Sequence, residues 1–517
     1  MGYSRKNDDA EEAYPLLGAK NATHKEPEWK QYLAAFLASI ISFSSGCVGG
    51  WSSPATPKLL SGNASDLGGI RRLTIEEVSW VGSLINLGAF FGSIPAGYLS
   101  FRWGRKKCLL SLAVPIIVGW LMILYNFNNV WFLYIGRFVS GISYGSLNVA
   151  LPIYNNEICN DNIRGRVGIF YDLMQCVGLV WVYSFGAFSN LFWVTVMCLV
   201  VPVVFIFTFI LMPESPLYLI RIGREEEAIK SIKWLHGDDC NVDLELARIN
   251  QALSEGKSTD LDDSLKENTD PNTDIDCENG TFCCPFWEII SNFYKGLSNV
   301  TIKAVLIAFF MFVLQRTCGA TMVQYYTDSI FQLAQSSVSP NVATILIGIV
   351  SLVSSLVSIM TVDFLGRRFL LTFSFFVMTL SMAVFVGYLT MIQNDTSTSH
   401  SNYGLIPSIT LCIFVAMFRL GVSPIPWFMA PEIIPTEAQK WAPSTIVCIT
   451  WGTSFLLSKS FLPAINASGQ LPVYSFFLIV CAIGVLYTWI FIPETKNKSR
   501  QEIQKELGAV TSCYEAI

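Results

Sequence analysis

VPIIVGWLMILY, residues 114–125, and WVTVMCLVVPVVFIFTFILM, residues 193–212, are apolar on every side of the helices that they predict. A helix on the surface of a soluble protein has a polar face, whereas a run of about 18 or more residues with few charges is typical of a membrane span. The composition agrees, because 52% of the 517 residues are hydrophobic and only 14% are charged, against roughly 25% in soluble domains. The sequence therefore predicts an all-α integral membrane protein.

Runs of this kind form two sets of six. The first set covers roughly 32–52, 78–100, 108–126, 131–155, 167–189 and 191–212, and the second covers 301–333, 341–362, 369–393, 403–430, 440–463 and 472–492. Six spans, a polar insert and six further spans are typical of a duplicated transporter. We predict a cytosolic tail, a six-helix bundle, a cytosolic linker with amphipathic helices, a second six-helix bundle and a second cytosolic tail, at 1–31, 32–212, 213–296, 297–492 and 493–517.

Short basic loops predict the orientation of the chain in the membrane. FRWGRKK at 101–107, NIRGR at 162–166 and DFLGRR at 363–368 all lie on one side, and this side is cytosolic by the positive-inside rule if both termini are cytosolic. Sequons that this topology places outside the cell give an independent check on it. The expected glycosylation sites are Asn63, Asn394 and Asn466.

The sequence contains no catalytic motif that would indicate an enzyme. The three histidines, His24, His236 and His400, lie in tails or loops, and no phosphate loop of the form GxxxxGK[ST] is present. The net charge of −5 gives no reason to expect a nucleic-acid partner. We expect neither an enzyme nor an ATP-driven pump, and no cofactor or metal; the expected partners are a small solute and the lipid bilayer.

Seven motifs at span boundaries give the chain a family resemblance. They are GRKK at 104–107, GR at 136–137, PIYNNEICNDNIRG at 152–165, PESPLYLIRIGREEEA at 213–228, GRR at 366–368, PIPWFMAPEIIP at 424–435 and PETKN at 493–497. In this order they resemble the sugar porter family of the major facilitator superfamily over essentially the whole membrane portion. The stretch GWSSPATPKL at 50–59 is similar to the insect facilitated trehalose transporters and endosomal-type hexose carriers of that family. The resemblance implies the major facilitator fold and facilitated diffusion of trehalose or a hexose-like sugar by alternating access.

The resemblance also implies a network of paired charges that holds the inner gate shut and breaks in each cycle. Reversible ion pairs at a partly solvated mouth suit this role. The residues that match the family's network are Arg105, Arg137, Glu157, Arg164, Glu214, Arg224, Asp363, Arg367, Arg368, Glu432 and Glu494. One departure is Phe101, which stands where the family usually has an acid, whereas the second half keeps its acid at Asp363.

A central sugar site needs amides, which donate and accept hydrogen bonds, beside an aromatic platform. By resemblance the platform is Trp427 and Trp451, and the span-seven motif keeps one glutamine, Gln315, and the aromatic pair Tyr325 and Tyr326. Other members of the amide set are replaced in this chain. The substituted or accompanying positions are Asp172, Arg316, Thr321, Thr450 and Ser454.

Two of these substitutions place opposite charges at positions that face the family's cavity. We expect Asp172 and Arg316 to interact directly or through water, since an intramembrane charge is normally paired or faces water. Arg419 is a further charge nearby. Three interpretations stay open: an ion pair that replaces two amides in a sugar carrier, a changed substrate that is charged, and a transport-inactive nutrient sensor.

Two short segments bear on energy coupling and on the address in the cell. Proton-coupled members of the family usually have an acid in span one, where this chain reads SGCVGGWSS at 45–53, so we expect a uniporter. EAYPLL at 12–17 resembles an acidic dileucine sorting signal, in which Glu12, Leu16 and Leu17 would bind an adaptor protein. We expect a multi-pass protein of the plasma membrane with endosomal cycling.

Overall fold

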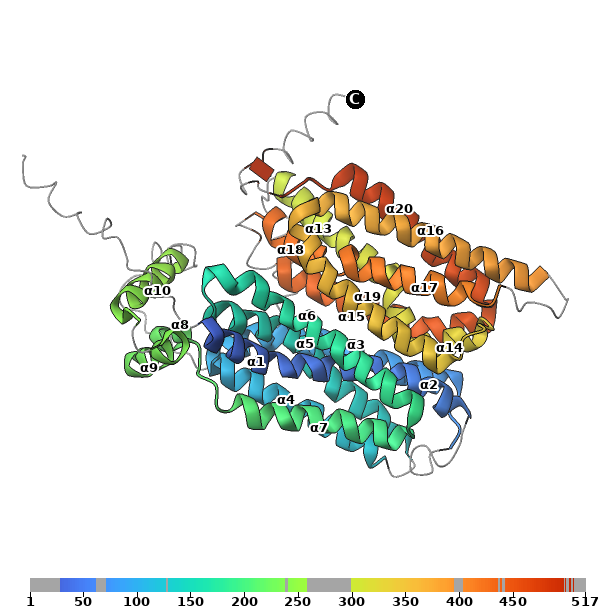
Figure 1. Ribbon diagram of the computed structural model, residues 1–517, viewed down its shortest axis with the longest axis horizontal. Coiled ribbons are helices and arrows are strands. Elements are labelled where there is room, and N and C mark those ends of the chain that lie inside the picture. Colours follow the sequence, from blue (N-terminus) through green and yellow to red (C-terminus); the bar gives the residue numbers. More distant parts are fainter. Residues whose placement is uncertain are drawn as a thin grey trace, which may run out of the picture.

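The computed structural model describes residues 28–61, 71–126, 129–237, 240–257, 299–394, 403–435, 438, 442–496, 498, 502–503 and 505. Within these ranges the protein is built from helices and has no strand. Two bundles lie side by side, with a small group of helices beside one end of the first bundle (Figure 1). The fold is that of a major facilitator protein, with twelve transmembrane helices in two sets of six.

The first bundle follows the predicted spans closely. Its elements are α1 (Glu28–Gly50), α2 (Ser52–Ser61), α3 (Ile75–Trp103), α4 (Arg105–Leu124), α5 (Val130–Ile158), α6 (Asp161–Phe188) and α7 (Leu191–Phe209). The first span is longer than predicted, because α2 continues it beyond Gly50. A capping box starts α3, since the Thr74 hydroxyl accepts from the Glu77 N–H while the Glu77 carboxylate accepts from the Thr74 N–H.

The second bundle repeats this plan with two broken spans. Its elements are α13 (Asn299–Thr317), α14 (Ala320–Leu333), α15 (Pro340–Leu365), α16 (Arg367–Asn394), α17 (Ile406–Met417), η1 (Phe418–Val422), α18 (Ile425–Ile433), α19 (Ala442–Ser468) and α20 (Gln470–Phe491). Span seven breaks at Gly319, which has φ +92°, a conformation that glycine adopts without a Cβ clash. Span ten changes from α-helix to the wider π-helix η1 and then restarts at the prolines of α18.

Eleven spans among the described residues are long and apolar enough to cross a membrane. The twelfth span of the fold is α5, which contains the polar residues Arg137, Asn155 and Glu157. The linker begins with three short helices, α8 (Pro216–Arg221), α9 (Glu225–His236) and α10 (Val242–Lys257). Its remaining residues, and the tail with Glu12, Leu16 and Leu17, lie outside the described residues.

The two bundles hold together at the end that lies away from α8–α10, which we call the far end; the other is the charged end. At the far end Asn86 of α3 donates from Nδ2 to Ser458 Oγ of α19 at 2.9 Å. Tyr183 of α6 donates to the carbonyl oxygen of Gln324 on α14 at 2.5 Å. The far end is therefore the side on which the halves are closed against each other.

Candidate functional site

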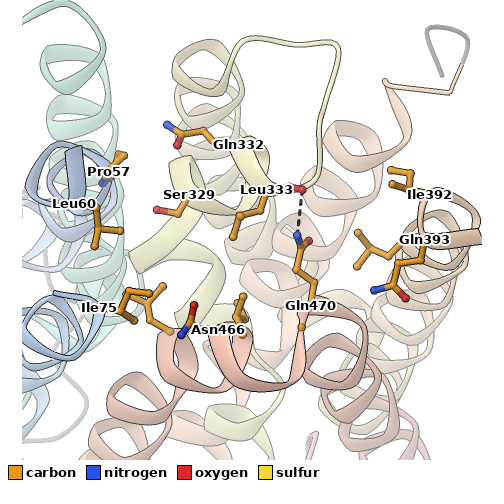
Figure 2. Close-up of a pocket in the computed structure, with 14 residues that line it drawn as sticks. Pro57, Leu60, Ile75, Ser329, Gln332, Leu333, Ile392, Gln393, Asn466 and Gln470 are labelled. Atoms are coloured by element: carbon orange, nitrogen blue, oxygen red, sulfur yellow. Dashed lines mark hydrogen bonds between the residues drawn. The ribbon is translucent and has the colours of Figure 1, made fainter. Parts of the chain in front are cut away.

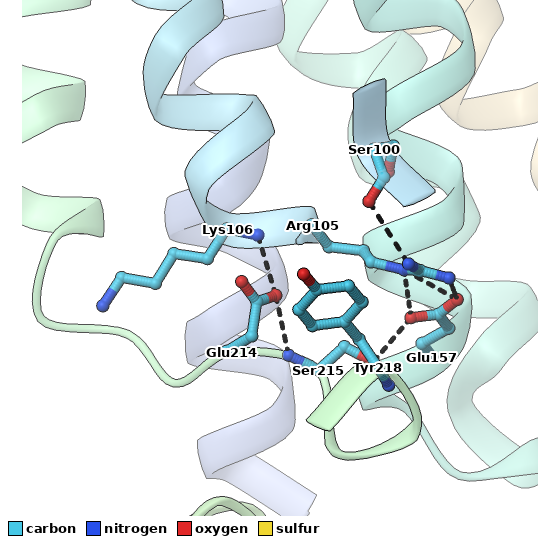
Figure 3. A network of polar contacts seen from close by, with 7 residues as sticks. All are labelled: Ser100, Arg105, Lys106, Glu157, Glu214, Ser215 and Tyr218. Atoms are coloured by element: carbon cyan, nitrogen blue, oxygen red, sulfur yellow. Dashed lines mark hydrogen bonds and ion pairs between the residues drawn. The ribbon is translucent and has the colours of Figure 1, made fainter. Parts of the chain in front are cut away.

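The charged end of the first bundle is organised around Arg105 and Glu157 (Figure 3). The guanidinium of Arg105 donates from Nε and Nη2 to both carboxylate oxygens of Glu157, at 2.7–3.0 Å. Ser215, the N-cap of α8, also donates to Glu157, at 2.5 Å. Because both charged side chains are largely buried, with exposed fractions of 6% and 14%, this forked pair ties the ends of α4, α5 and α8 together.

Glu214 caps the N-terminus of α4. One of its oxygens accepts from the backbone N–H of Lys106 at 2.9 Å and from that of Ser215 at 3.0 Å (Figure 3). A carboxylate is stabilised there by the unpaired amides and by the helix dipole. Burial raises the pKa of the Glu214 carboxyl above its usual value, and the backbone hydrogen bonds oppose that shift. Gly104, with φ +98°, makes room for this carboxylate, since a Cβ there would lie 2.5 Å from Glu214 Oε2.

The second bundle repeats this arrangement with its own residues. Arg367 donates from Nη1 to Glu432 at 2.8 Å, and the carboxylate of Glu494 accepts from the backbone N–H groups of Arg367 and Arg368 at 3.1 Å. Gly366, with φ +84°, immediately precedes α16, just as Gly104 immediately precedes α4. The two charge clusters are therefore equivalent sites of a duplicated fold, and both ion pairs join residues of a single half.

Two residues predicted for the inner-gate network lie elsewhere. Arg224 is exposed on the N-terminus of α9 and pairs only weakly with Glu227, one turn on, at 3.4 Å. Arg137 lies at the far end, fully buried, where it donates to the carbonyl oxygens of Val48 and Val81. It also donates to Ser52 Oγ at 2.7 Å and so binds the junction of α1 and α2. The structure does not bring these two side chains to either charge cluster, and a role for them in the gate stays a prediction.

The remaining predicted gate and glycosylation residues make few contacts with other described side chains or lie outside the described residues. Arg368 donates to the carbonyl oxygen of Trp489 and lies over its ring, 6.0 Å from the centroid. The side chains of Arg164 and Asp363 lie outside the described residues, as does Asn63. Asn394 ends α16 and is exposed, as is Asn466 two residues before the end of α19.

We expect Glu157→Gln to lower solute uptake about tenfold, whereas Arg224→Ala leaves it within twofold. Removing one partner of a buried ion pair costs about 3–5 kcal/mol, whereas an exposed pair contributes roughly 0–1 kcal/mol. Initial uptake rates, normalised to the amount of protein at the cell surface, measure the difference. Equal losses in the two variants would contradict the separation of Arg224 from the charge cluster.

Arg316 lies at the level where the two halves meet. Its guanidinium carbon is 5.0 Å from the ring centroid of Trp451 in α19, a cation–π contact. The Trp451 ring in turn packs edge-on against Tyr144 of α5, with centroids 5.1 Å apart. One predicted cation and one predicted platform residue are therefore adjacent, and Tyr144 of the opposite half completes the group.

Asp172 pairs with a different arginine from the one expected. Arg419 of η1 donates from Nη1 to Asp172 Oδ1 at 3.1 Å, and Ser355 of α15 donates to Oδ2. The expected partner, Arg316, makes no ion pair among the described residues. The Asp172–Arg419 pair thus joins α6 of the first half to the π-helical break of span ten in the second half.

Most of the remaining predicted binding residues form hydrogen bonds or packing contacts within the protein. Gln315 donates from Nε2 to the carbonyl oxygens of Val422 and Ser423, at 2.9 and 2.7 Å, and so supports the break in span ten. The hydroxyls of Thr450 and Ser454 donate to their own helix one turn back. Trp427 packs edge-on against Phe312, and Thr321 is buried at the start of α14.

The aromatic pair of span seven contributes to the closed far end. Tyr325 donates to Asn86 Oδ1 of the other half at 3.2 Å, while Tyr326 donates to the carbonyl oxygen of Ser458 at 3.3 Å. A Cβ on Gly82 of α3 would lie 2.3 Å from the Tyr326 hydroxyl, so only glycine fits there. Asn86 was missed by the sequence analysis, although a lone amide in an apolar span was a usable signal.

Further polar residues around the centre were also missed. Tyr171, next to Asp172, donates to Asn148 Oδ1 at 2.5 Å, and Gln175 donates to the Tyr144 hydroxyl at 3.5 Å. Gln175 follows Asp172 by three residues on α6, so the two side chains lie on the same face of the helix. This spacing was a usable sign that the face still carries an amide.

A cavity of about 520 Å³ lies at the far end. Its walls come from both halves (Figure 2). Pro57, Leu60 and Ile75 form an apolar side, and Gln332, Gln393, Asn466 and Gln470 supply amides. Because the residues of both halves touch it, the volume of this cavity depends on the halves being closed at this end.

Comparison with known proteins places this geometry in a family. A family model described as sugar (and other) transporter matches residues 32–507. The chain belongs to this sugar transporter family. This sugar transporter is 31% identical to the facilitated trehalose transporter Tret1 of Bombyx mori, over 94% of its own length and 89% of the relative's. It is 29% identical to Tret1 of Polypedilum vanderplanki, over 93% and 88%.

Solved structures agree on the fold of this sugar transporter. The xylose transporter XylE from E. coli, in a partially occluded inward open conformation, superposes with a TM-score of 0.68 at 18% identity, covering 90% of this chain and 100% of that one. XylE bound to 6-bromo-6-deoxy-D-glucose superposes with a TM-score of 0.66 at 19% identity, covering 93% and 99%. At this identity the likeness concerns the fold.

Proposed function

We propose that this protein is a facilitative carrier that moves a sugar-type solute by alternating access. The observation that carries the proposal is the unequal contact between the halves. At the far end Asn86, Tyr183 and Tyr325 bridge the two bundles, whereas at the charged end each described ion pair stays within one bundle. A carrier that is closed on one side and held by separable contacts on the other has the asymmetry that alternating access requires.

The central group supports a solute site between the halves. Trp451 and Arg316 come from the second bundle, and Tyr144, Asn148 and Gln175 come from the first. Aromatic faces beside amides and hydroxyls suit the apolar face and hydroxyl rim of a sugar. Its relatives from Bombyx mori and Polypedilum vanderplanki are facilitated trehalose transporters, which makes trehalose the first solute to try.

We infer that the charged end faces the cytosol and that the far end faces the outside. The basic residues at the starts of α4 and α16 support this orientation by the positive-inside rule. The exposed residues Asn394 and Asn466 lie at the far end and would then be open to glycosylation. Residence in the plasma membrane, endosomal cycling and adaptor binding at Glu12, Leu16 and Leu17 complete the proposal.

The test is solute uptake in a cell that lacks its own hexose carriers. The solutes to test are trehalose, glucose, fructose, polyols and a sugar acid. We expect saturable uptake of at least one of them, and net uptake should stop once that solute reaches its passive equilibrium across the membrane. The stretch SGCVGGWSS at 45–53 of span one has no acid to couple protons, so a protonophore should leave uptake unchanged while the membrane voltage is clamped. Uptake that collapses under these conditions would contradict facilitated diffusion, and no uptake of any of these solutes would contradict the carrier function.

A further inference from the structure

The charges at the centre of the protein do not cancel. Asp172 and Arg419 neutralise each other across the halves at 3.1 Å. Arg316 has no acidic partner among the described residues, and its Nε is buried without a hydrogen-bond partner. The central group therefore carries one uncompensated positive charge.

The cation–π contact does not settle this charge. A cation at the level of the membrane core is costly, and a buried donor left unsatisfied adds to that cost. A cation–π contact recovers part of it. The Trp451 ring thus offsets only part of the cost, and the rest is relieved when an anion approaches the guanidinium.

Two more polar atoms in the same region lack partners. Gln315, adjacent to Arg316 in the chain and 3% exposed, uses both of its hydrogen bonds at Nε2, which leaves Oε1 buried and unsatisfied. Trp451, 2% exposed, has no acceptor for its Nε1–H. A hydroxyl can donate to Gln315 Oε1 and another can accept from Trp451 Nε1, so the group offers places for hydroxyls beside a place for an anion.

We propose that the solute is a sugar acid, a polyhydroxylated molecule with one carboxylate, and that its carboxylate binds the guanidinium of Arg316. This inference rests on the proposed function and specifies its solute. Only one positive charge is uncompensated, which favours a monoanion over a dianion such as a sugar phosphate. A planar carboxylate also matches the forked geometry of a guanidinium.

The proposal has a consequence that a neutral sugar does not share. Passive transport of a monoanion moves net charge, so its equilibrium distribution depends on membrane voltage. One elementary charge is worth about 2.3 kcal/mol per 100 mV, and a factor of ten corresponds to about 1.4 kcal/mol, so about 60 mV gives about tenfold accumulation. A neutral sugar carried by the same protein distributes equally at every voltage.

The experiment uses the purified full chain in liposomes, with the voltage set by a potassium gradient and valinomycin. The probes are radiolabelled glucuronate and glucose. At about 60 mV, inside positive, we expect the glucuronate concentration inside the liposomes to become about ten times that outside. Any glucose that enters should reach equal concentrations on the two sides. If glucose enters and glucuronate neither enters nor competes with it, the sugar-acid inference is overturned while the carrier function stands; if neither enters, and the wider solute panel also fails, the carrier function itself is overturned.

Variants separate recognition of the carboxylate from a merely structural role. Arg316→Gln removes the charge and places a second amide beside Gln315, and we expect at least a tenfold loss of glucuronate uptake with glucose uptake retained or increased. Arg316→Lys keeps the charge and should keep glucuronate uptake within about fivefold. The control is Arg224→Gln, an exposed cation whose loss should change neither flux. A loss of both solutes to the same degree in Arg316→Gln, with the protein monodisperse, overturns the inference.

Discussion

Asp172→Asn is expected to lower uptake at least tenfold and to lower the melting temperature of the purified protein by several degrees. The substitution removes the carboxylate that the guanidinium of Arg419, 6% exposed, faces across the two halves. Breaking a buried pair by removing one partner costs about 3–5 kcal/mol, and the one-third exposure of Asp172 moves the expected value toward the lower end. Uptake assays and thermal unfolding followed by size-exclusion chromatography measure the two effects.

The double variant Asp172→Asn with Arg419→Gln distinguishes pairing from separate roles. If the two side chains act mainly on each other, removing both charges leaves neither of them as an unpaired buried ion and recovers most of the lost thermal stability. Additive losses of stability in the double variant would show that neither side chain stabilises the protein mainly through the other.

A second ion pair between the halves provides the matched control. Lys459 of α19 pairs with Glu76 of α3 at the far end, where the Glu76 side chain is 63% exposed. Exposed pairs contribute roughly 0–1 kcal/mol, so Glu76→Gln should shift the melting temperature by no more than about two degrees. A large shift in this control would mean that any contact between the halves is costly to lose, whatever its burial.

The fold was largely predictable because its main signal is local. A continuous apolar run marks a span without reference to its neighbours, and the family and fold predictions were confirmed. The misses are places where the signal is not apolar. The predicted first span ended at residue 52, before Pro54, Pro57 and Lys58. In the structure α2 continues it to Ser61, and the Lys58 ammonium donates to the carbonyl oxygens of Gly186 and Ser189.

The partners within the site were less predictable because they depend on geometry that spacing does not contain. Two arginines, Arg316 and Arg419, are both more than a hundred residues from Asp172 in the chain, and nothing local says which one reaches it. The π-helical turn of η1, which carries Arg419, changes the direction of side chains in span ten. The sequence therefore indicated which charged residues lie within the spans, but their pairing required the structure.

Gly145→Val is expected to abolish the folded carrier, reducing the monodisperse peak in size-exclusion chromatography to less than about a tenth of that of the parent. The α3 and α5 backbones touch at this residue, since a Cβ on Gly145 would lie 2.2 Å from the carbonyl oxygen of Ala89 and 2.5 Å from its Cα. Small residues permit such close helix packing in membranes. The matched control is Gly387→Val in α16, because a Cβ there meets nothing within 4 Å.

The seam between α3 and α5 cannot accommodate the valine by a local adjustment. Gly92 of α3 faces the carbonyl oxygen of Ile142 of α5, at 2.0 Å from its would-be Cβ, so both helices present bare backbone over successive turns. Ordinary contact of about 3.5–4 Å requires α3 to move by more than about 1 Å along this seam. Asn86 lies on the same helix and holds Ser458 of the other half at 2.9 Å, so that displacement breaks the far-end closure as well. The milder Gly145→Ala should therefore give some folded protein that binds solute but transports it slowly, and a Gly145→Ala variant with the transport rate of the parent would contradict the link between this seam and the closure.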